Sequence, residues 1–274
     1  MIRNLLTEER PVAVYRHVML EFERDAFAVL GNQILIGDIG TYTLYINHKP
    51  VVLRPGSLVL MRSGDVVRTE GAMSDFRVSC LAFSDDILRD ASLKVAPMVA
   101  EYMQHNFTTD VSVICLMANR MTDIIESMVG NVSTQCLHDV TLMHLRAFFL
   151  VCYDLLGELH RGINVHNKRK EELWGKFLSL ISAHYKRERT VAFYAERMNM
   201  TTRYLNDVVS YATGSNVKAV IDEYVMAHLK TTLKTDTRSI KEIAFEYGFE
   251  SSSFFCDYFK KHIGLSPQVY RGGN

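Results

Sequence analysis

The sequence predicts an α+β protein in which a strand-rich front is followed by helices and then by an all-α domain. Six of the 15 glycines fall between Gly31 and Gly71, and three of the five prolines lie in the first 60 residues. No proline occurs between Met98 and Ser266. A proline-free stretch permits helices because proline removes a backbone donor and clashes inside a helix. The last 85 residues also hold a degenerate repeat with helix-turn-helix layout.

Short segments rich in β-branched and aromatic residues predict the strands of the front part, and Gly, Pro, Asn and Asp turn signals separate them. Many short strands at this spacing are typical of a sandwich or a barrel. The expected strands are Val12–Phe22, Gln33–Ile39, Thr41–Ile46, Val51–Leu53, Ser57–Met61, Val66–Glu70 and Phe76–Phe83.

Side chains of these strands are candidates for the wall of a pocket that binds a small-molecule effector. The alternative is ordinary core packing, with control by a protein partner and no ligand. The candidates are Tyr15, Met19, Phe22, Tyr42, Leu44, Met61, Phe76, Val78 and Cys80.

Apolar residues at helical spacing predict two helices, Ser112–Ser127 and Leu137–Leu159. The second is apolar over more than half its surface, so we expect it to pack on the barrel, and we consider that it also packs on a second subunit. The candidate dimerisation residues are Leu142, Leu145, Phe148, Phe149, Cys152 and Leu156.

Composition and charge divide the chain further. We expect an effector-binding and dimerisation domain at 1–160 (barrel 1–90, helices 97–160), a polar linker at 161–170 and a second domain at 171–274. The formal net charge is zero, but residues 1–167 carry 14 basic and 19 acidic side chains, and residues 168–274 carry 17 and 12. A basic rear half is compatible with a polyanionic partner, although scatter could also produce this imbalance.

The repeat in the rear half aligns Thr190-Val191 with Ser239-Ile240, and Tyr204 with Phe254. In the second copy, Ser239 to Glu242 fits a capping box, and Gly248 supplies the sharp turn. The helix Val217–Lys234 lies between the copies and is about 27 Å long at ~1.5 Å per residue. Such a spacer could hold two recognition helices near successive major grooves, which lie ~34 Å apart. We expect the apolar face of the last recognition helix to consist of Phe254, Phe255, Tyr258 and Phe259.

The segment Ile240–Arg271 resembles the C-terminal signature of the AraC/XylS family of transcription regulators. The matching residues are Ile240, Ile243-Ala244, Gly248-Phe249, Phe255, Phe259-Lys260-Lys261, Gly264, Ser266-Pro267 and Tyr270-Arg271. The resemblance covers about Leu173–Gly272. It implies a cupin-like N-terminal barrel, binding to double-stranded promoter DNA, a homodimer, and an effect on RNA polymerase in the cytoplasm.

The resemblance also implies that the second helix of each copy enters a major groove. The candidates for base contacts are Thr202, Arg203, Asn206, Asp207, Ser210, Ser252, Ser253, Cys256 and Asp257. The candidates for phosphate contacts are Arg238, Lys241, Lys260, Lys261 and Arg271.

Several residues depart from the family pattern. Asp207 and Asp257 stand where a basic residue is usual, and Asn199 replaces the glycine of the first turn. Thr231-Thr232 and Arg238 stand at positions where the family usually has apolar or basic residues. An aspartate can accept from cytosine but repels phosphate. The first copy could therefore bind weakly or contact mainly backbone.

An enzyme is the competing class, because cupin-like barrels also host metal sites. The strand region offers only His17 and His48, whereas a metal site needs several converging ligands. We therefore expect no enzymatic activity, cofactor or bound metal. The five scattered cysteines suggest reduced thiols, and no apolar run approaches the ~20 residues of a membrane helix.

Overall fold

The computed structural model describes residues 6, 10–19, 26–69, 75–92, 108–109, 111–160 and 165–272. The chain divides into two compact units. The N-terminal unit comprises Met1–Asp25 and Val29–Asn164, and the C-terminal unit comprises Val165–Asn274 together with Ala26–Ala28. Within the described ranges, no helix is both long enough and apolar enough to cross a membrane.

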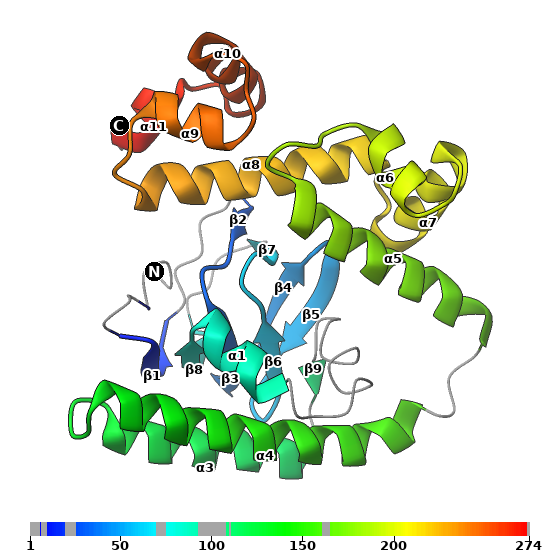
Figure 1. Cartoon of the computed structure of the whole chain (residues 1–274). Helices are drawn as coiled ribbons and strands as arrows, with labels where there is room; N and C mark the ends of the chain where they lie inside the picture. The colour runs from blue at the N-terminus through cyan, green and yellow to red at the C-terminus, as the bar shows by residue number, and fades with distance from the viewer. Residues whose placement is uncertain are drawn as a thin grey trace. The chain divides into compact units, whose positions relative to one another are not determined.

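The N-terminal unit contains two antiparallel sheets (Figure 1). The first has the order β1-β8-β3-β6-β9, and the second contains β7, β4 and β5. Their bounds are β1 Val12–Val18, β3 Asn32–Ile39, β4 Tyr42–Ile46, β5 Lys49–Leu53, β6 Leu58–Met61, β7 Val66–Thr69, β8 Arg77–Phe83 and β9 Thr108–Thr109. All seven predicted strands are confirmed, with β1 shorter than expected, whereas β9 was not predicted.

The expected closed barrel is not formed by the described strands, which leave β1 and β9 at the edges of the first sheet. Three helices pack on the first sheet and bury its apolar side chains. They are α1 (Asp85–Ser92), α3 (Ser112–Met128) and α4 (Thr134–His160). The two long helices were predicted and α1 was not.

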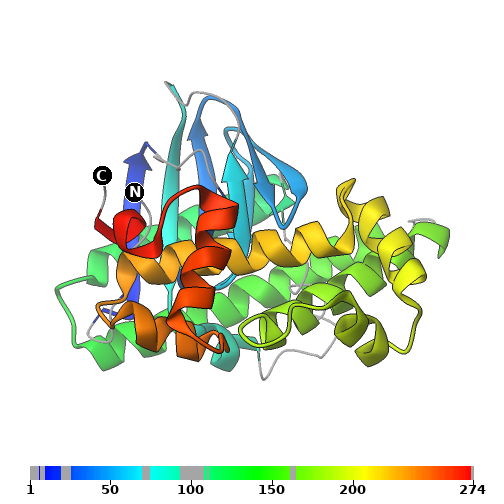
Figure 2. The same ribbon diagram turned by 90° about the horizontal axis from the view of Figure 1, so that it is seen from above.

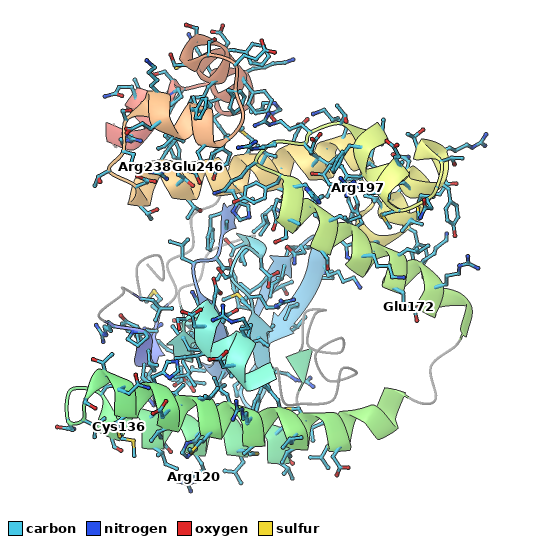
Figure 3. The ribbon with its side chains drawn as sticks, viewed as in Figure 1. Arg120, Cys136, Glu172, Arg197, Arg238 and Glu246 are labelled. Atoms are coloured by element: carbon cyan, nitrogen blue, oxygen red, sulfur yellow. The ribbon has the colours of Figure 1, made fainter. Side chains whose placement is uncertain are left out.

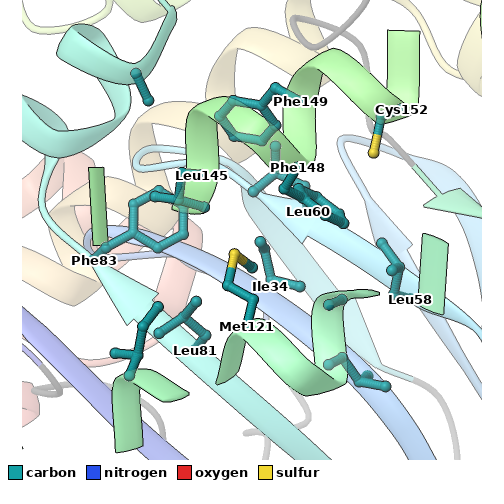
Figure 4. Close-up of a cluster of buried hydrophobic side chains, with 14 of the residues drawn as sticks. Ile34, Leu58, Leu60, Leu81, Phe83, Met121, Leu145, Phe148, Phe149 and Cys152 are labelled. Carbon is teal, nitrogen blue, oxygen red and sulfur yellow. The ribbon is translucent and has the colours of Figure 1, made fainter. Parts of the chain in front are cut away.

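One apolar cluster joins these helices to the first sheet (Figure 4). Ile34, Leu60 and Phe83 of the sheet lie in the same cluster as Met121 of α3 and Phe148 of α4. Since burial of such side chains contributes ~1.5–3 kcal/mol each, the cluster fixes the two helices on the sheet.

The cluster corrects the predicted dimerisation surface. Leu145, Phe148, Phe149 and Cys152 are almost fully buried within the chain itself, so they cannot contact a partner. Leu142 is half-buried, and the side chain of Leu156 lies outside the described residues. A helix that is apolar over more than half its surface does not reveal by periodicity which of its faces packs on its own core. The prediction was therefore wrong for the four buried residues.

The predicted pocket residues are largely packed as well. Tyr42, Leu44, Met61, Phe76, Val78 and Cys80 are buried, and the rings of Tyr42 and Phe76 lie 5.5 Å apart. Tyr15 is half-buried, Met19 is exposed, and Phe22 lies outside the described residues. Burial raises the pKa of the Cys80 thiol to about 12, which keeps it neutral.

The C-terminal unit is helical, apart from the short β2 (Phe27–Ala28). Its helices are α5 (Val165–His184), α6 (Val191–Arg197), α7 (Thr202–Thr213), α8 (Val217–Thr235), α9 (Ile240–Glu246), α10 (Ser252–Ile263) and α11 (Pro267–Gly272). Residues 165–170, expected within a linker, instead form the start of α5. In Figures 1 and 2, α8 runs between the pair α6–α7 at one end and α9–α11 at the other.

Candidate nucleic-acid interface

The first helix-turn-helix consists of α6 and α7. The Thr190 side chain caps α6 by accepting from the amide of Phe193, and Thr201 caps α7 by accepting from the amide of Tyr204. Asn199 makes the turn at φ 52°, as expected of the residue that replaces glycine. Leu205, Val208 and Val209 are buried, so the opposite face of α7 is exposed.

The second helix-turn-helix, α9 and α10, repeats this arrangement. The predicted capping box is present: the Ser239 hydroxyl accepts from the amide of Glu242, and the Glu242 carboxylate accepts from the amide of Ser239. These bonds from Ser239 lower the pKa of Glu242. The turn glycine Gly248 has φ 67°, and the buried Phe249 packs against Phe255 at a ring separation of 5.0 Å.

Helix α8 joins the two copies and is itself mostly buried. Its 19 residues span about 28 Å. Two departures from the family pattern have structural roles on this helix. The Thr232 hydroxyl lies 2.7 Å from that of Tyr247. Thr231 is buried, and its hydroxyl bonds both the amide and the carbonyl of Ala28 at 3.2 Å.

Six of the nine predicted base-contact residues are exposed: Thr202, Arg203, Asp207, Ser210, Ser253 and Asp257. Ser252 and Cys256 are half-buried. Burial, and secondarily the carboxylate of Asp257, raises the pKa of Cys256, so its thiol is neutral. Asn206 is half-buried, and its Oδ1 accepts a 3.2 Å bond from the amide of Val217 at the start of α8. This bond holds the Asn206 amide against the start of α8.

Four of the five predicted phosphate contacts are exposed cations, namely Lys241, Lys260, Lys261 and Arg238. Arg238, however, lies with Glu246 (Figure 3), and their Nη2 and Oε2 atoms are 2.6 Å apart. Arg238 also pairs with Asp236.

Arg271 turns inward and donates from Nη1 to the carbonyl of Arg238 at 2.7 Å. Its Nε and Nη2 are buried and meet no hydrogen-bond partner among the residues described. Arg238 and Arg271 therefore stabilise the second helix-turn-helix through contacts within the chain. Their positions in the sequence did not indicate this role.

Residues of the loop after α5 were missed by the sequence analysis. Arg189 lies with its guanidinium 4.1 Å from the ring centre of Phe249 and donates to the carbonyls of Lys186 and Tyr247. Lys186 pairs with Glu246, and this bond, with a smaller contribution from Arg238, lowers the pKa of that carboxyl. These partners lie about 60 positions apart in sequence, so no local pattern reveals them.

Two similarities to known proteins cover only part of the chain. A family described as "Helix-turn-helix domain" matches residues 194–273. The melibiose operon regulatory protein of Escherichia coli K12 is 30% identical over 96 residues, which cover 35% of this chain and 32% of that protein. The match thus spans about a third of the length of this curated relative.

Two longer similarities cover most of the chain. The HTH-type transcriptional regulator ExsA of Pseudomonas aeruginosa is 22% identical over 262 residues, covering 92% of this chain and 87% of that protein. The crystal structure of ToxT from Vibrio cholerae O395 superposes with a TM-score of 0.51 and 16% identity, covering 96% and 97% of the two chains. This structural likeness shows a common fold.

The turn of the second copy provides a test of the interface geometry. A Cβ on Gly248 would lie 3.3 Å from both the carbonyl of Lys186 and the Cγ of Arg187. An L-residue in the left-handed region costs ~1–2 kcal/mol. We therefore expect Gly248→Ala to lower the free energy of unfolding by about 1–2 kcal/mol in urea denaturation.

The equivalent turn provides the control. Asn199→Gly relieves left-handed strain but increases the freedom of the unfolded chain, so we expect a change within about 0.5 kcal/mol. Equal losses in both variants, or no loss at Gly248, would contradict the assigned geometry.

Proposed function

The helix-turn-helix domain of this chain is of the AraC/XylS type, and we propose from this premise that it reads two successive major grooves of promoter DNA. The observation that carries the proposal is the pairing of two capped recognition helices, α7 and α10, each with exposed polar side chains in its N-terminal half. Recognition helices contact base edges through their N-terminal residues.

The length of α8 supports simultaneous binding by both helices. About 28 Å of helix separates the two copies, close to the ~34 Å between successive major-groove faces on one side of the duplex. Because α8 is buried along much of its length, it acts as a rigid spacer. Rigidity reduces the entropy lost on binding.

We assign direct readout in α7 to Arg203, with Thr202, Asp207 and Ser210 beside it. Arg203 is exposed and makes no ion pair with any residue that the structure describes. Its guanidinium fits guanine O6 and N7 in bidentate fashion. We assign Asn206 to bracing the start of α8, and phosphate contacts to Lys241, Lys260 and Lys261. Binding then alters recruitment of RNA polymerase.

The full chain, incubated with random duplex DNA, should select a bipartite site, with affinity that falls as salt rises. Arg203→Ala should relax one guanine preference, at a cost of about 1–3 kcal/mol. Lys260→Ala should weaken all sequences alike and reduce the slope of log K against log salt by about 0.9.

Lys176→Ala is the matched control, because Lys176 is an exposed cation on α5. We expect it to leave binding and slope unchanged. Failure to recover any enriched sequence would overturn the proposed function.

A homodimer is the second part of the proposal, with an interface that differs from the one predicted. The described parts of α3 and α4, which lie side by side in Figures 1 and 2, expose apolar side chains away from their core-facing residues. Exposed apolar side chains that gather on neighbouring helices are candidates for an interaction site. These residues are Val113, Leu116 and Ile124 of α3 and Met143, Leu150 and Leu155 of α4.

Leu150→Glu separates this surface from the buried one. Leu150 is 52% exposed, so we expect the variant to sediment as a folded monomer. Phe148→Ala should instead lower the free energy of unfolding by about 3–5 kcal/mol, because Phe148 is fully buried. A Leu150→Glu variant that still sediments as a dimer would exclude this interface.

We further propose that a small molecule controls the N-terminal unit. A ToxT structure with the same fold, at 17% identity and a TM-score of 0.51, carries a naphthalenyl-butenoic acid. The described residues here line an open pocket of about 890 Å³, within the volume range of ligand sites. None of the nine predicted pocket residues lines it. Its walls are Leu6, Pro11, Leu30, Gly31, Ser84, Asp85, Asp86, Thr134, Gln135 and His138.

A thermal-shift screen of the full chain against metabolites tests this control. A ligand present at 100 times its Kd adds ~2.7 kcal/mol to the free energy of unfolding and raises Tm. If no compound raises Tm and a protein partner alone changes DNA binding, the alternative of control by a protein is correct.

A further inference from the structure

Both recognition helices expose an aromatic side chain at their third residue. Phe254 of α10 is 60% exposed, and Tyr204 of α7 is 38% exposed. From the sequence, Phe254 was expected in the apolar face of α10, but only Phe255 and Phe259 of that face are buried. An exposed phenyl ring in the first turn of a recognition helix lies where base contacts are made.

The ring of Phe254 is held in place on one side. The amide of Phe254 donates to the Ser251 hydroxyl at 3.1 Å, which fixes the first turn of α10. Its ring centre is 6.2 Å from that of Phe249, and the guanidinium of Arg189 lies 4.1 Å from the ring centre of Phe249. The phenyl group is thus oriented before any ligand binds, which lowers the entropy cost of using it.

The groups around Phe254 are unusual for a DNA-reading surface. Ser253 and Asp257 are the exposed polar side chains in the same N-terminal half, and no Lys, Arg, Asn or Gln occurs between Ser251 and Phe259. The surface therefore offers an apolar ring, a hydroxyl and an acceptor-only carboxylate. It lacks the paired donors that grip guanine and the amide that matches adenine.

This set of groups fits the major-groove edges of pyrimidines. Thymine presents its C5-methyl group, which an apolar ring contacts, and cytosine presents the N4 amine, which a carboxylate accepts. Adenine also presents an amine, but its N7 acceptor lies beside it and repels a carboxylate. Guanine presents two acceptors there and is disfavoured more strongly.

We propose that α10 reads a pyrimidine step, with Phe254 on the C5-methyl of a thymine and Asp257 on the N4 amine of a neighbouring cytosine. This inference rests on the proposed DNA-binding function. It makes the two halves of the site chemically different, because α7 reads guanine through Arg203 whereas α10 reads pyrimidines. The aspartate that departs from the family pattern thereby becomes a specificity determinant.

The test uses the full chain and the duplex recovered by selection, with each thymine replaced in turn by deoxyuridine, which lacks only the methyl group. Removing one contacted methyl should weaken binding about fourfold, the equivalent of ~0.8 kcal/mol. Phe254→Ala should weaken binding to the thymine duplex and show no further loss on the deoxyuridine duplex. Phe254→Leu should retain part of the methyl dependence.

The two-way comparison separates readout from a general structural effect. If Phe254 only stabilised the helix, Phe254→Ala would weaken both duplexes and leave the fourfold methyl dependence intact, which would overturn the inference. Methyl dependence in the half-site read by α7 should be unchanged by Phe254→Ala.

Asp257→Asn provides an independent check. Its amide matches adenine N6 and N7, so the preferred base at one position should change from cytosine to adenine. An unchanged preference would overturn the role of Asp257. If the wild-type chain retained the selected duplex but ignored every methyl group, the inference would fail and the proposed function would stand. If it retained no duplex, the proposed function itself would fail.

Discussion

The placement of the second helix-turn-helix on the spacer helix α8 depends on the packing of one side chain, Tyr185. Its ring centre lies 4.3 Å from that of His228 and 5.4 Å from that of Tyr224, both on α8, and 5.9 Å from that of Tyr247 at the end of α9. One ring thus joins the end of α5, the spacer helix and the second helix-turn-helix. Burial raises the pKa of Tyr247 to about 12, so its hydroxyl stays protonated near neutral pH.

Much of this architecture follows from local sequence. The strands, the two long helices, the capping box at Ser239 and the left-handed turn at Asn199 all depend on patterns within a few residues, and the structure confirms them. The errors involve partners distant in sequence. Arg238 forms an ion pair with Glu246, and Arg271 donates to a backbone carbonyl. Phe148 packs on the sheet rather than on a partner. The exposure of Phe254 also escaped prediction, because Phe255 and Phe259 fill the core-facing centre of α10 and leave Phe254 on its flank.

Because of these internal partners, the excess of basic residues in the rear half overstates the number of cations that can contact DNA. Arg189, Arg238 and Arg271 serve packing and bracing, so the cations assigned to phosphate are a few exposed lysines. Asp207 and Asp257 add negative charge to the surface assigned to DNA. A surface of this kind relies less on attraction to phosphate and more on direct base contacts. Two half-sites bound together then supply affinity that neither copy provides alone.

The central claim is that one chain places two recognition helices in successive major grooves on the same face of a duplex. Hydroxyl-radical footprinting of the full chain on its selected site measures this spacing directly. We expect each bound chain to protect two clusters about one helical turn, ~10.5 base pairs, apart on one face. A single protected cluster, or two clusters on opposite faces of the duplex, would contradict the central claim.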